Sequence, residues 1–248
     1  MQKGDPIDII SIANGLDFPT SQEQVKVFLE SYAAYELKSD PNQIDPLKIL
    51  SDSRKKEPEA PTAKDFHKRT VLAAEIVYQL HGEWSMGRLK LQKLMYLAQQ
   101  TTNMSLHTNF LKQANGPYDP VLMRSLEIQF KKHKWFVYKQ GEREKYQFLE
   151  NAGGHKEWYE RYFAHELEDI SFLIELFRRA KTNQVELVAT IYHCWKQLLD
   201  ETNHYDFDLL VEKFYKWSEE KEKFSLTQIK NAISWMEEKG IFPSKNRA

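Results

Sequence analysis

The apolar residues of this chain recur mostly at the spacing of an α-helix. Three segments between residues 69 and 132 carry apolar side chains three and four positions apart, which places them on one face of a helix. These positions are Ala73, Ile76, Val77 and Leu80 in the first segment, Leu91, Leu94, Met95 and Ala98 in the second, and Leu122, Leu126 and Phe130 in the third. The pattern therefore predicts three amphipathic helices in this part of the chain.

A turn is predicted just before the third helix. Gly116 and Pro117 form a rigid dipeptide, because proline fixes its own φ and restricts the residue before it. Asn115 and Tyr118 flank it as polar side chains. Asp119 and Pro120 come next, as an N-cap residue and a first helical residue. The conformational preferences of turn residues are enough to explain this arrangement. The same residues also give the chain a rigid start to the third helix.

The period of the pattern changes after the third helix. Residues 135–149 alternate between aromatic and polar side chains, with Gly141 near the middle. Alternation of this kind is typical of a β-hairpin. Three helices followed by a hairpin is the order of elements in a winged helix.

The last hundred residues return to helical spacing, with Leu167, Ile170, Ile174 and Phe177 on one face. Several helix ends are marked by capping residues. The predicted signals are a capping box of Asn183 and Glu186, an N-cap at Asp206, a capping box of Ser225 and Gln228, and a glycine stop at Gly240. We expect these helices to form a small bundle.

The pattern divides the chain into four sections. Residues 1–38 contain one helical pattern, at 21–37, and residues 39–64 hold four prolines and a charged run that predict a linker. Residues 65–154 and 155–248 are the two folded sections. The predicted fold class is mostly α: a helical domain with one winged-helix-like hairpin, followed by a C-terminal helical bundle.

Composition limits the classes of function. The chain has 248 residues, 41% of them hydrophobic and 29% charged, and its net charge is -1, so it creates no overall basic field for nucleic acid. Cys194 stands alone in an apolar helical pattern, which favours a buried thiol and a reducing compartment. No run is long and apolar enough for a membrane span or a signal-peptide core. We expect a cytoplasmic protein with no membrane partner.

No pattern of catalytic or metal-binding residues stands out. The eight histidines are scattered, and His165 in "HELED" lacks the second histidine of a zinc protease motif. The nucleophile-elbow, phosphate-loop and dinucleotide-binding motifs are missing from the sequence. We expect no metal, no cofactor and no enzymatic activity. A deep pocket lined by histidines and carboxylates from distant segments would revive the enzyme hypothesis.

Basic residues indicate a function more clearly than the histidines do. A winged helix grips phosphates with lysines and arginines of its helices and wing. The candidate DNA-binding residues are Arg88, Lys90, Lys131, Lys132, Lys134, Arg143 and Lys145. The alternative is that the cations at 131–134 solubilise a helix end, where they also suit the helix dipole.

Two motifs together resemble a known family. The segment "LKLQKLMYLAQQ" and, after it, "NFLKQANGPYDPVLMRSL" resemble the Panacea domain of antitoxin-like proteins over about residues 66–150. The family pattern of a Leu-x-Lys-Leu-x-Tyr helix and a later Gly-Pro turn falls on Leu91, Lys93, Leu94, Tyr96, Gly116 and Pro117. Residues 65–245 also resemble a region at the C-terminus of some bacterial type I restriction specificity subunits. This chain has no room for the two target-recognition domains of such a subunit, so their reading of DNA sequence is not carried over.

The resemblance implies binding and not catalysis, in a bacterial defence setting. Its expected partner is a cognate toxin or a restriction-modification subunit, and self-association into a homodimer stays open. The candidate partner-binding residues are Lys93, Tyr96, Asn115, Gly116, Pro117 and Tyr118. Tyr96, Tyr118 and Trp135 would anchor a partner if exposed and belong to the core if buried. The alternative is a winged-helix DNA-binding protein, as an operon regulator or a DNA-contacting subunit.

Overall fold

A computed structural model describes residues 61–102, 104–139 and 145–243. The helix predicted at 21–37, most of the predicted linker and Arg143 lie outside these residues. The described part forms one compact unit, within residues 60–248.

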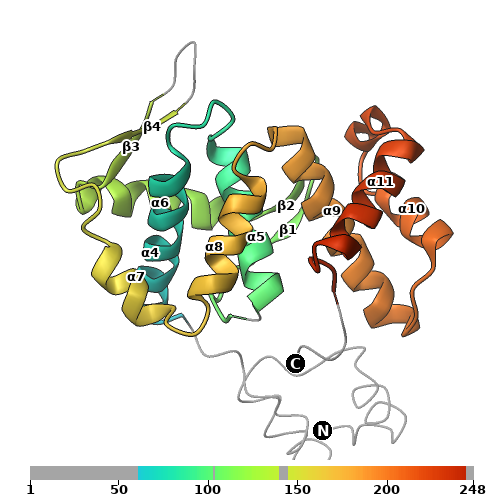
Figure 1. The fold of residues 1–248 in the computed structure, drawn as a ribbon, viewed down its shortest axis with the longest axis horizontal. Helices are drawn as coiled ribbons and strands as arrows, with labels where there is room; N and C mark the ends of the chain where they lie inside the picture. The colour runs from blue at the N-terminus through green and yellow to red at the C-terminus, as the bar shows by residue number, and fades with distance from the viewer. Residues whose placement is uncertain (1–60, 103, 140–144, 244–248) are drawn as a thin grey trace, which may run out of the picture. The chain divides into compact units, whose positions relative to one another are not determined.

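This unit is mostly helical, as predicted, and contains two small antiparallel hairpins (Figure 1). The elements in chain order are α4 (Ala63–Leu80), α5 (Arg88–Thr102), β1 (Leu111–Gln113), β2 (Gly116–Tyr118), α6 (Pro120–Lys132), β3 (Phe136–Lys139), β4 (Lys145–Phe148), α7 (Lys156–Tyr162), α8 (Leu167–Phe177), α9 (Thr182–Thr202), α10 (Phe207–Tyr215), a short 3-10 helix η1 (Glu219–Lys223) and α11 (Leu226–Glu238).

Most predicted helix starts are confirmed. The Asp119 carboxylate accepts a hydrogen bond from the Leu122 N–H at 2.9 Å, and Pro120 is the first residue of α6. Asp206 caps α10 in the same way, at 2.9 Å from the Leu209 nitrogen. Ser225 and Gln228 form the expected capping box of α11. A side-chain acceptor at these positions satisfies an amide that the helix cannot pair internally.

Two predicted boundaries are corrected. Helix α4 begins at Ala63, capped by Thr62 and Asp65, so the last two residues of the predicted linker are helical. The capping box predicted for α9 is wrong. The Lys181 amide donates instead to the Gln184 side chain, at 2.8 Å, and Glu186 is buried. Spacing alone could not show that Glu186 binds cations from a distant segment.

The structure contains one hairpin that the sequence predicted and one that it did not. The predicted hairpin pairs β3 with β4, from Phe136 opposite Phe148 to Lys139 opposite Lys145. The other pairs β1 with β2, with Leu111 opposite Tyr118. Gly116 and Pro117 therefore lie in a strand and do not form the turn. Strands of three residues are too short for an alternating pattern to reveal them.

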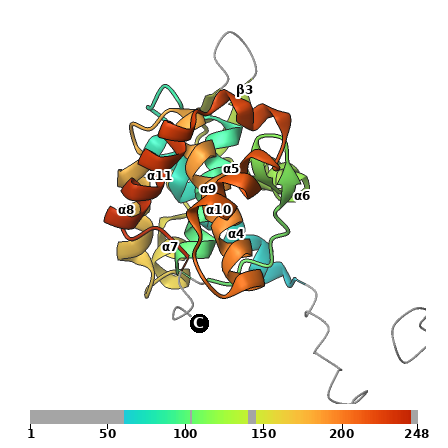
Figure 2. The same cartoon turned by 90° about the vertical axis from the view of Figure 1, so that its right-hand side faces the viewer.

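The helices pack around α5. It contacts α4, α8 and α9, and α4 in turn contacts α6 and α7. The last two helices, α10 and α11, pack against α9, and Figures 1 and 2 show them on the side of α9 away from α4. The apolar positions that predicted these helices are buried, Leu167 only partly, and so is Cys194.

The boundary predicted after residue 154 falls inside this core. His155, the first residue beyond it, forms a hydrogen bond through Nε2 with the buried Glu75 carboxylate of α4 at 2.8 Å. Lys156 binds the same carboxylate at 2.9 Å. Burial alone would raise the pKa of Glu75, but the bonds from His155, Gln79 and Lys156 lower it to about 2. Periodicity locates helices along the chain, but it does not say which helices pack together.

Gly116 gives a direct test of this packing. Its φ is +92°, and a Cβ built on it would lie 2.6 Å from the Thr190 hydroxyl of α9. We expect Gly116→Ala to destabilise the protein by about 2–4 kcal/mol, because it adds overpacking to an unfavourable backbone conformation. Urea unfolding measures this change.

Two other glycines serve as controls. Gly240 has φ +68° with open space around it, so Gly240→Ala should cost only about 1 kcal/mol. Gly82 has neither constraint, and Gly82→Ala should stay within about 0.5 kcal/mol of the wild type. Equal losses at all three positions would contradict the close approach of β2 to α9.

Candidate functional site

The two motifs of the chain meet inside the protein. Lys93 of α5 is 0% exposed, and its Nζ donates a hydrogen bond to the Pro117 carbonyl of β2 at 2.6 Å. The Gln92 side chain donates to the same carbonyl at 2.8 Å. The lysine of the helix motif thus holds the Gly-Pro strand in place. We call this contact between Lys93 and Pro117 the clamp.

The clamp lies beside a buried ion cluster. Glu186 of α9 receives a hydrogen bond from the buried Lys221 of η1 at 2.6 Å, and another from Lys223 at 3.0 Å. Burial lowers the pKa of Lys93 to about 7; repulsion from Lys221 adds to this, and attraction to Glu186 opposes it. Because Glu186 is already bonded to two cations, Lys93 relies on carbonyl oxygen for its partner.

A second segment of the chain also holds the β1–β2 hairpin. The Trp217 indole N–H, from the segment after α10, donates to the Gln113 carbonyl at 2.6 Å. The Ser218 hydroxyl donates to the Ala114 carbonyl at 2.9 Å. The hairpin therefore links the helices near α5 with those near α10.

Most of the predicted partner-binding residues are internal. Lys93, Gly116 and Pro117 are buried. Tyr96 is buried too: its hydroxyl lies 3.1 Å from His193 Nδ1, and burial raises its pKa well above the usual value.

Only two of the predicted partner-binding residues reach the surface: Asn115 is exposed and Tyr118 is partly buried. Of the three aromatic side chains proposed as anchors, Tyr96 and Trp135 are core residues.

The first two predicted DNA-binding residues, Arg88 and Lys90, are both bound to other parts of the protein. Lys90 is fully buried, and its Nζ donates to the Ser85 hydroxyl and to the Arg178 and Ala180 carbonyls at 2.9–3.0 Å. Burial lowers the pKa of Lys90 to about 8. Its three acceptors show that it secures the chain just after α8, and it has no donor left for phosphate.

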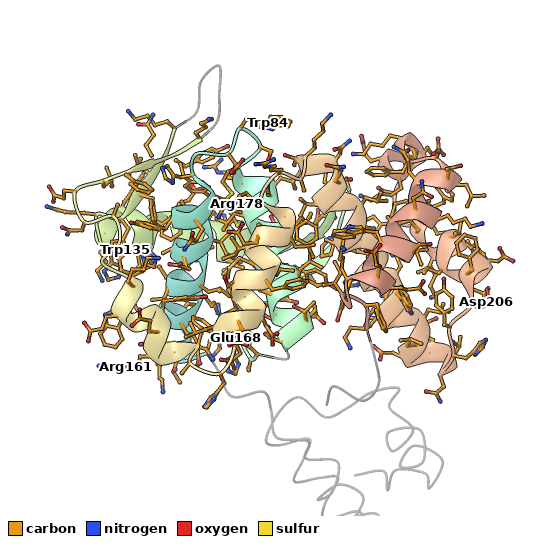
Figure 3. All side chains as sticks on the ribbon, in the orientation of Figure 1. Trp84, Trp135, Arg161, Glu168, Arg178 and Asp206 are labelled. Atoms are coloured by element: carbon orange, nitrogen blue, oxygen red, sulfur yellow. The ribbon has the colours of Figure 1, made fainter. Side chains whose placement is uncertain are left out.

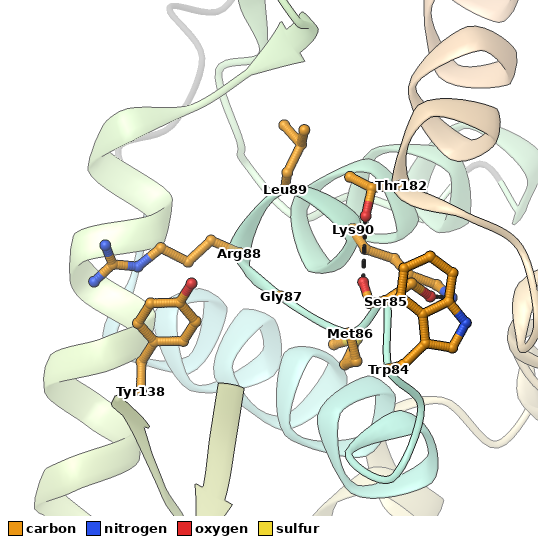
Figure 4. A pocket seen from close by; sticks show the side chains of 9 residues that line it. All are labelled: Trp84, Ser85, Met86, Gly87, Arg88, Leu89, Lys90, Tyr138 and Thr182. Atoms are coloured by element: carbon orange, nitrogen blue, oxygen red, sulfur yellow. Dashed lines mark hydrogen bonds between the residues drawn. The ribbon is translucent and has the colours of Figure 1, made fainter. Parts of the chain in front are cut away.

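Arg88 is bound to α6. Its guanidinium makes two hydrogen bonds to the Glu127 carboxylate, at 2.5 and 2.6 Å, and lies 4.2 Å from the centre of the Tyr138 ring. It lines a pocket of about 320 Å³ together with Tyr138, Thr182 and Trp84, and Trp84 is 66% exposed (Figures 3 and 4). The lining of this pocket includes no histidine or carboxylate, so it gives the enzyme hypothesis no support.

The remaining basic residues lie at the C-terminal end of α6 and in the hairpin. Lys131 and Lys132 are exposed, whereas Lys145 is partly buried at the start of β4. Lys134 follows the C-cap residue of α6, with φ +57° and its amide bonded to the Lys131 carbonyl at 3.0 Å. Its side chain pairs with Glu150. Lys134 therefore has a structural role at the helix end.

The outer side of α6 carries a feature that sequence analysis missed. Val121 is 62% exposed and Ile128 is 64% exposed, although both sit on a well-formed helix. They are seven residues apart and so share one side, where Arg124 and Lys132 are also exposed. We call these four residues the α6 face. The sequence did contain a signal for this feature, because Val121 and Ile128 lie outside the apolar stripe of Leu122, Leu126 and Phe130.

No described helix is long and apolar enough to cross a membrane. Within the described ranges, no three histidine, cysteine or acidic side chains come together to hold a metal ion. No protein-family model matches the sequence, and a comparison with curated proteins gives no significant match. The resemblance to the Panacea domain rests on its two motifs.

The clamp predicts a pH dependence of stability. The pKa of Lys93 is about 7 in the folded protein and about 10.4 in an unfolded chain. Between these values the unfolded state binds more protons, so this lysine makes stability rise with pH, by up to about 1.4 kcal/mol per pH unit. Urea unfolding at pH 7, 8 and 9 should show a shallower rise for Lys93→Met than for the wild type.

The exposed Lys230 of α11 provides the matched control. Lys230→Met should keep the pH slope of the wild type, since its ammonium is solvated in both states. Parallel curves of unfolding free energy against pH for Lys93→Met and the wild type would show that burial does not lower the pKa of Lys93.

Proposed function

We propose that this protein is a non-enzymatic interaction module of a bacterial defence system, antitoxin-like or associated with type I restriction-modification. It acts by direct binding to a partner protein through the α6 face. The observation that carries the proposal is the pair of exposed aliphatic side chains, Val121 and Ile128, on a rigid helix. Exposed apolar groups rimmed by polar residues are typical of protein interaction sites.

The rigidity of α6 favours binding. Asp119 and Pro120 fix its start, and the Asp119 carboxylate also accepts from the Asn109 amide at 2.8 Å. Its far end is closed by the Trp135 N–H, which donates to the Phe130 carbonyl at 2.9 Å. A surface that is already ordered loses little conformational entropy when a partner docks.

The charge of α6 indicates the kind of partner. Its one carboxylate, Glu127, is neutralised by Arg88. Arg124, Lys131 and Lys132 leave the exposed side positive. An apolar centre with a cationic rim suits a partner whose own apolar residues are flanked by aspartate or glutamate. In this proposal the Panacea-like motif holds the scaffold, because the clamp fixes Pro117 three residues before α6 begins.

A charge substitution on the α6 face tests the proposal. The full-length protein is co-expressed with the protein encoded beside it in its native genome, and co-purification is measured. We expect a stoichiometric complex with the wild type and at least a tenfold loss of affinity for Val121→Glu combined with Ile128→Glu, since two carboxylates would then face an acidic partner.

Leu226→Glu is the matched control, because Leu226 is 52% exposed on the distant α11. Substitutions at such exposed sites change stability by only about 0.5 kcal/mol. Loss of the complex with the control, or its retention with the double variant, would refute docking at the α6 face.

DNA binding is the second candidate. The observation in its favour is the order of elements: α4, α5 and α6 come before the β3–β4 hairpin, and α6 is the last of the three. Lys131 and Lys132 are exposed at the C-terminal end of α6. In a winged helix this helix enters the major groove and the hairpin contacts the backbone. Exposed Val121 and Ile128 fit protein docking better than phosphate contact.

Salt dependence decides this second candidate. If the two lysines contact phosphates, Lys131→Ala combined with Lys132→Ala should reduce the slope of log K against log salt by about 1.8, from roughly 0.9 per contact. Fluorescence anisotropy with duplex DNA measures this slope, and Lys230→Ala on α11 should leave it unchanged. An affinity that ignores salt, or an unchanged slope in the double variant, would exclude DNA contact by these residues.

A further inference from the structure

A pair of histidines joins the C-terminal end of α6 to α4. His133 is the C-cap residue of α6, and its amide N–H reaches the Gln129 carbonyl at 2.9 Å. The ring of His67, on α4, lies 5.7 Å from the ring of His133, measured between centroids. The Trp135 ring stacks on His133 at 4.6 Å. The two imidazoles are thus packed against each other at the helix end.

Helix α7 closes the cluster around His67. The Trp158 and Tyr162 rings meet it edge-on, at 5.1 and 5.6 Å. The Tyr162 hydroxyl also forms a hydrogen bond with His67 Nδ1 at 3.0 Å. A neutral imidazole nitrogen can donate or accept in this bond, whereas an imidazolium can only donate. Protonation therefore restricts the geometry that Tyr162 can adopt.

The charged groups near the pair are mainly positive. Lys132 precedes His133 in the chain. On the neighbouring helices, Lys68 lies over the Phe163 ring and Arg161 lies over the Trp158 ring.

The nearby carboxylates are bonded to other groups: Asp65 to Thr62, Glu150 to Lys134 and Glu157 to Arg161. No described carboxylate bonds to either imidazole, so two imidazolium ions at this distance would repel each other without compensation.

We propose that His67 and His133 form a proton-operated latch: while both rings are neutral, the last turn of α6 is closed, and their protonation opens it. The consequence for partner binding rests on the function proposed above, because Lys132 of the α6 face lies in this turn. The latch would make the partner dissociate as the pH falls.

The direction of the pH effect is set by the environment of the rings. Burial lowers the pKa of His67 and repulsion from His133 adds to this; burial, and then Lys132, lowers the pKa of His133. The folded state thus binds fewer protons than the unfolded chain, whose histidines have a pKa of about 6.5. Stability from this pair is fully present above that value and is lost as the pH falls below it.

Hydrogen exchange of the full-length protein, without a partner, tests the latch. The amides of residues 131–135 are compared at pH 7.5 and 5.5 after correction for the intrinsic exchange chemistry. We expect severalfold faster exchange at pH 5.5, because two imidazolium rings at this distance repel each other and favour the open turn. His67→Gln should diminish the pH effect, because it removes the repulsion between the two rings and leaves only the burial of His133 and its repulsion from Lys132.

His165→Gln, at an exposed histidine, should retain the full effect. Equal protection at both pH values, or an undiminished effect in His67→Gln, would overturn the latch. A second measurement needs no variant: ring resonances of His67 and His133 should titrate below pH 6.5, and a value above 6.5 for either would overturn it. Neither test involves a partner, so failure of the latch is distinct from failure of docking at Val121 and Ile128.

Discussion

The hydrogen bond from Lys93 Nζ to the Pro117 carbonyl is the contact on which the arrangement of this protein depends. It joins α5, at the centre of the core, to a strand of only three residues that could not hold its position alone. Gly116 lets that strand approach α9, and Trp217 binds Gln113 of the other strand of the same hairpin. A buried amino group is costly unless it is hydrogen-bonded, and so is a buried carbonyl, so this bond satisfies both groups. The helices on both sides of the hairpin are thereby held in one unit.

This constraint changes the meaning of the two motifs. Four residues that the sequence predicted at a binding surface are internal: Lys93, Tyr96, Gly116 and Pro117. Among them, Lys93 holds Pro117, which lies just before α6. That helix begins three residues after Pro117 and exposes Val121 and Ile128. In the proposed function, the motifs preserve the scaffold and α6 meets the partner.

Sequence reasoning was most successful where local chemistry decides. Helical spacing located the longer helices of the described region but not α7, which has only seven residues. Asp119, Asp206 and Ser225 marked the starts of three of these helices, because a cap satisfies amides within a few residues. It failed where the partner is distant in the chain. Glu186 fits a capping box by spacing but binds Lys221, and Lys90 looks like a surface cation but bonds to carbonyls after α8. The apolar residues outside the stripe of α6 were visible in the sequence, yet only their exposure distinguishes a docking face from a second core contact.

Lysine labelling under native conditions tests the central claim most directly. The folded full-length protein is treated with an amine-reactive reagent, and the modification of each lysine is followed by mass spectrometry. If the helix motif forms an internal clamp, Lys93 should stay unmodified while the exposed Lys131 and Lys132 react, and it should become reactive only when the protein is unfolded in urea. Modification of Lys93 at a rate similar to that of Lys131 in the folded protein would contradict the account and return this residue to the surface as a candidate for direct partner contact.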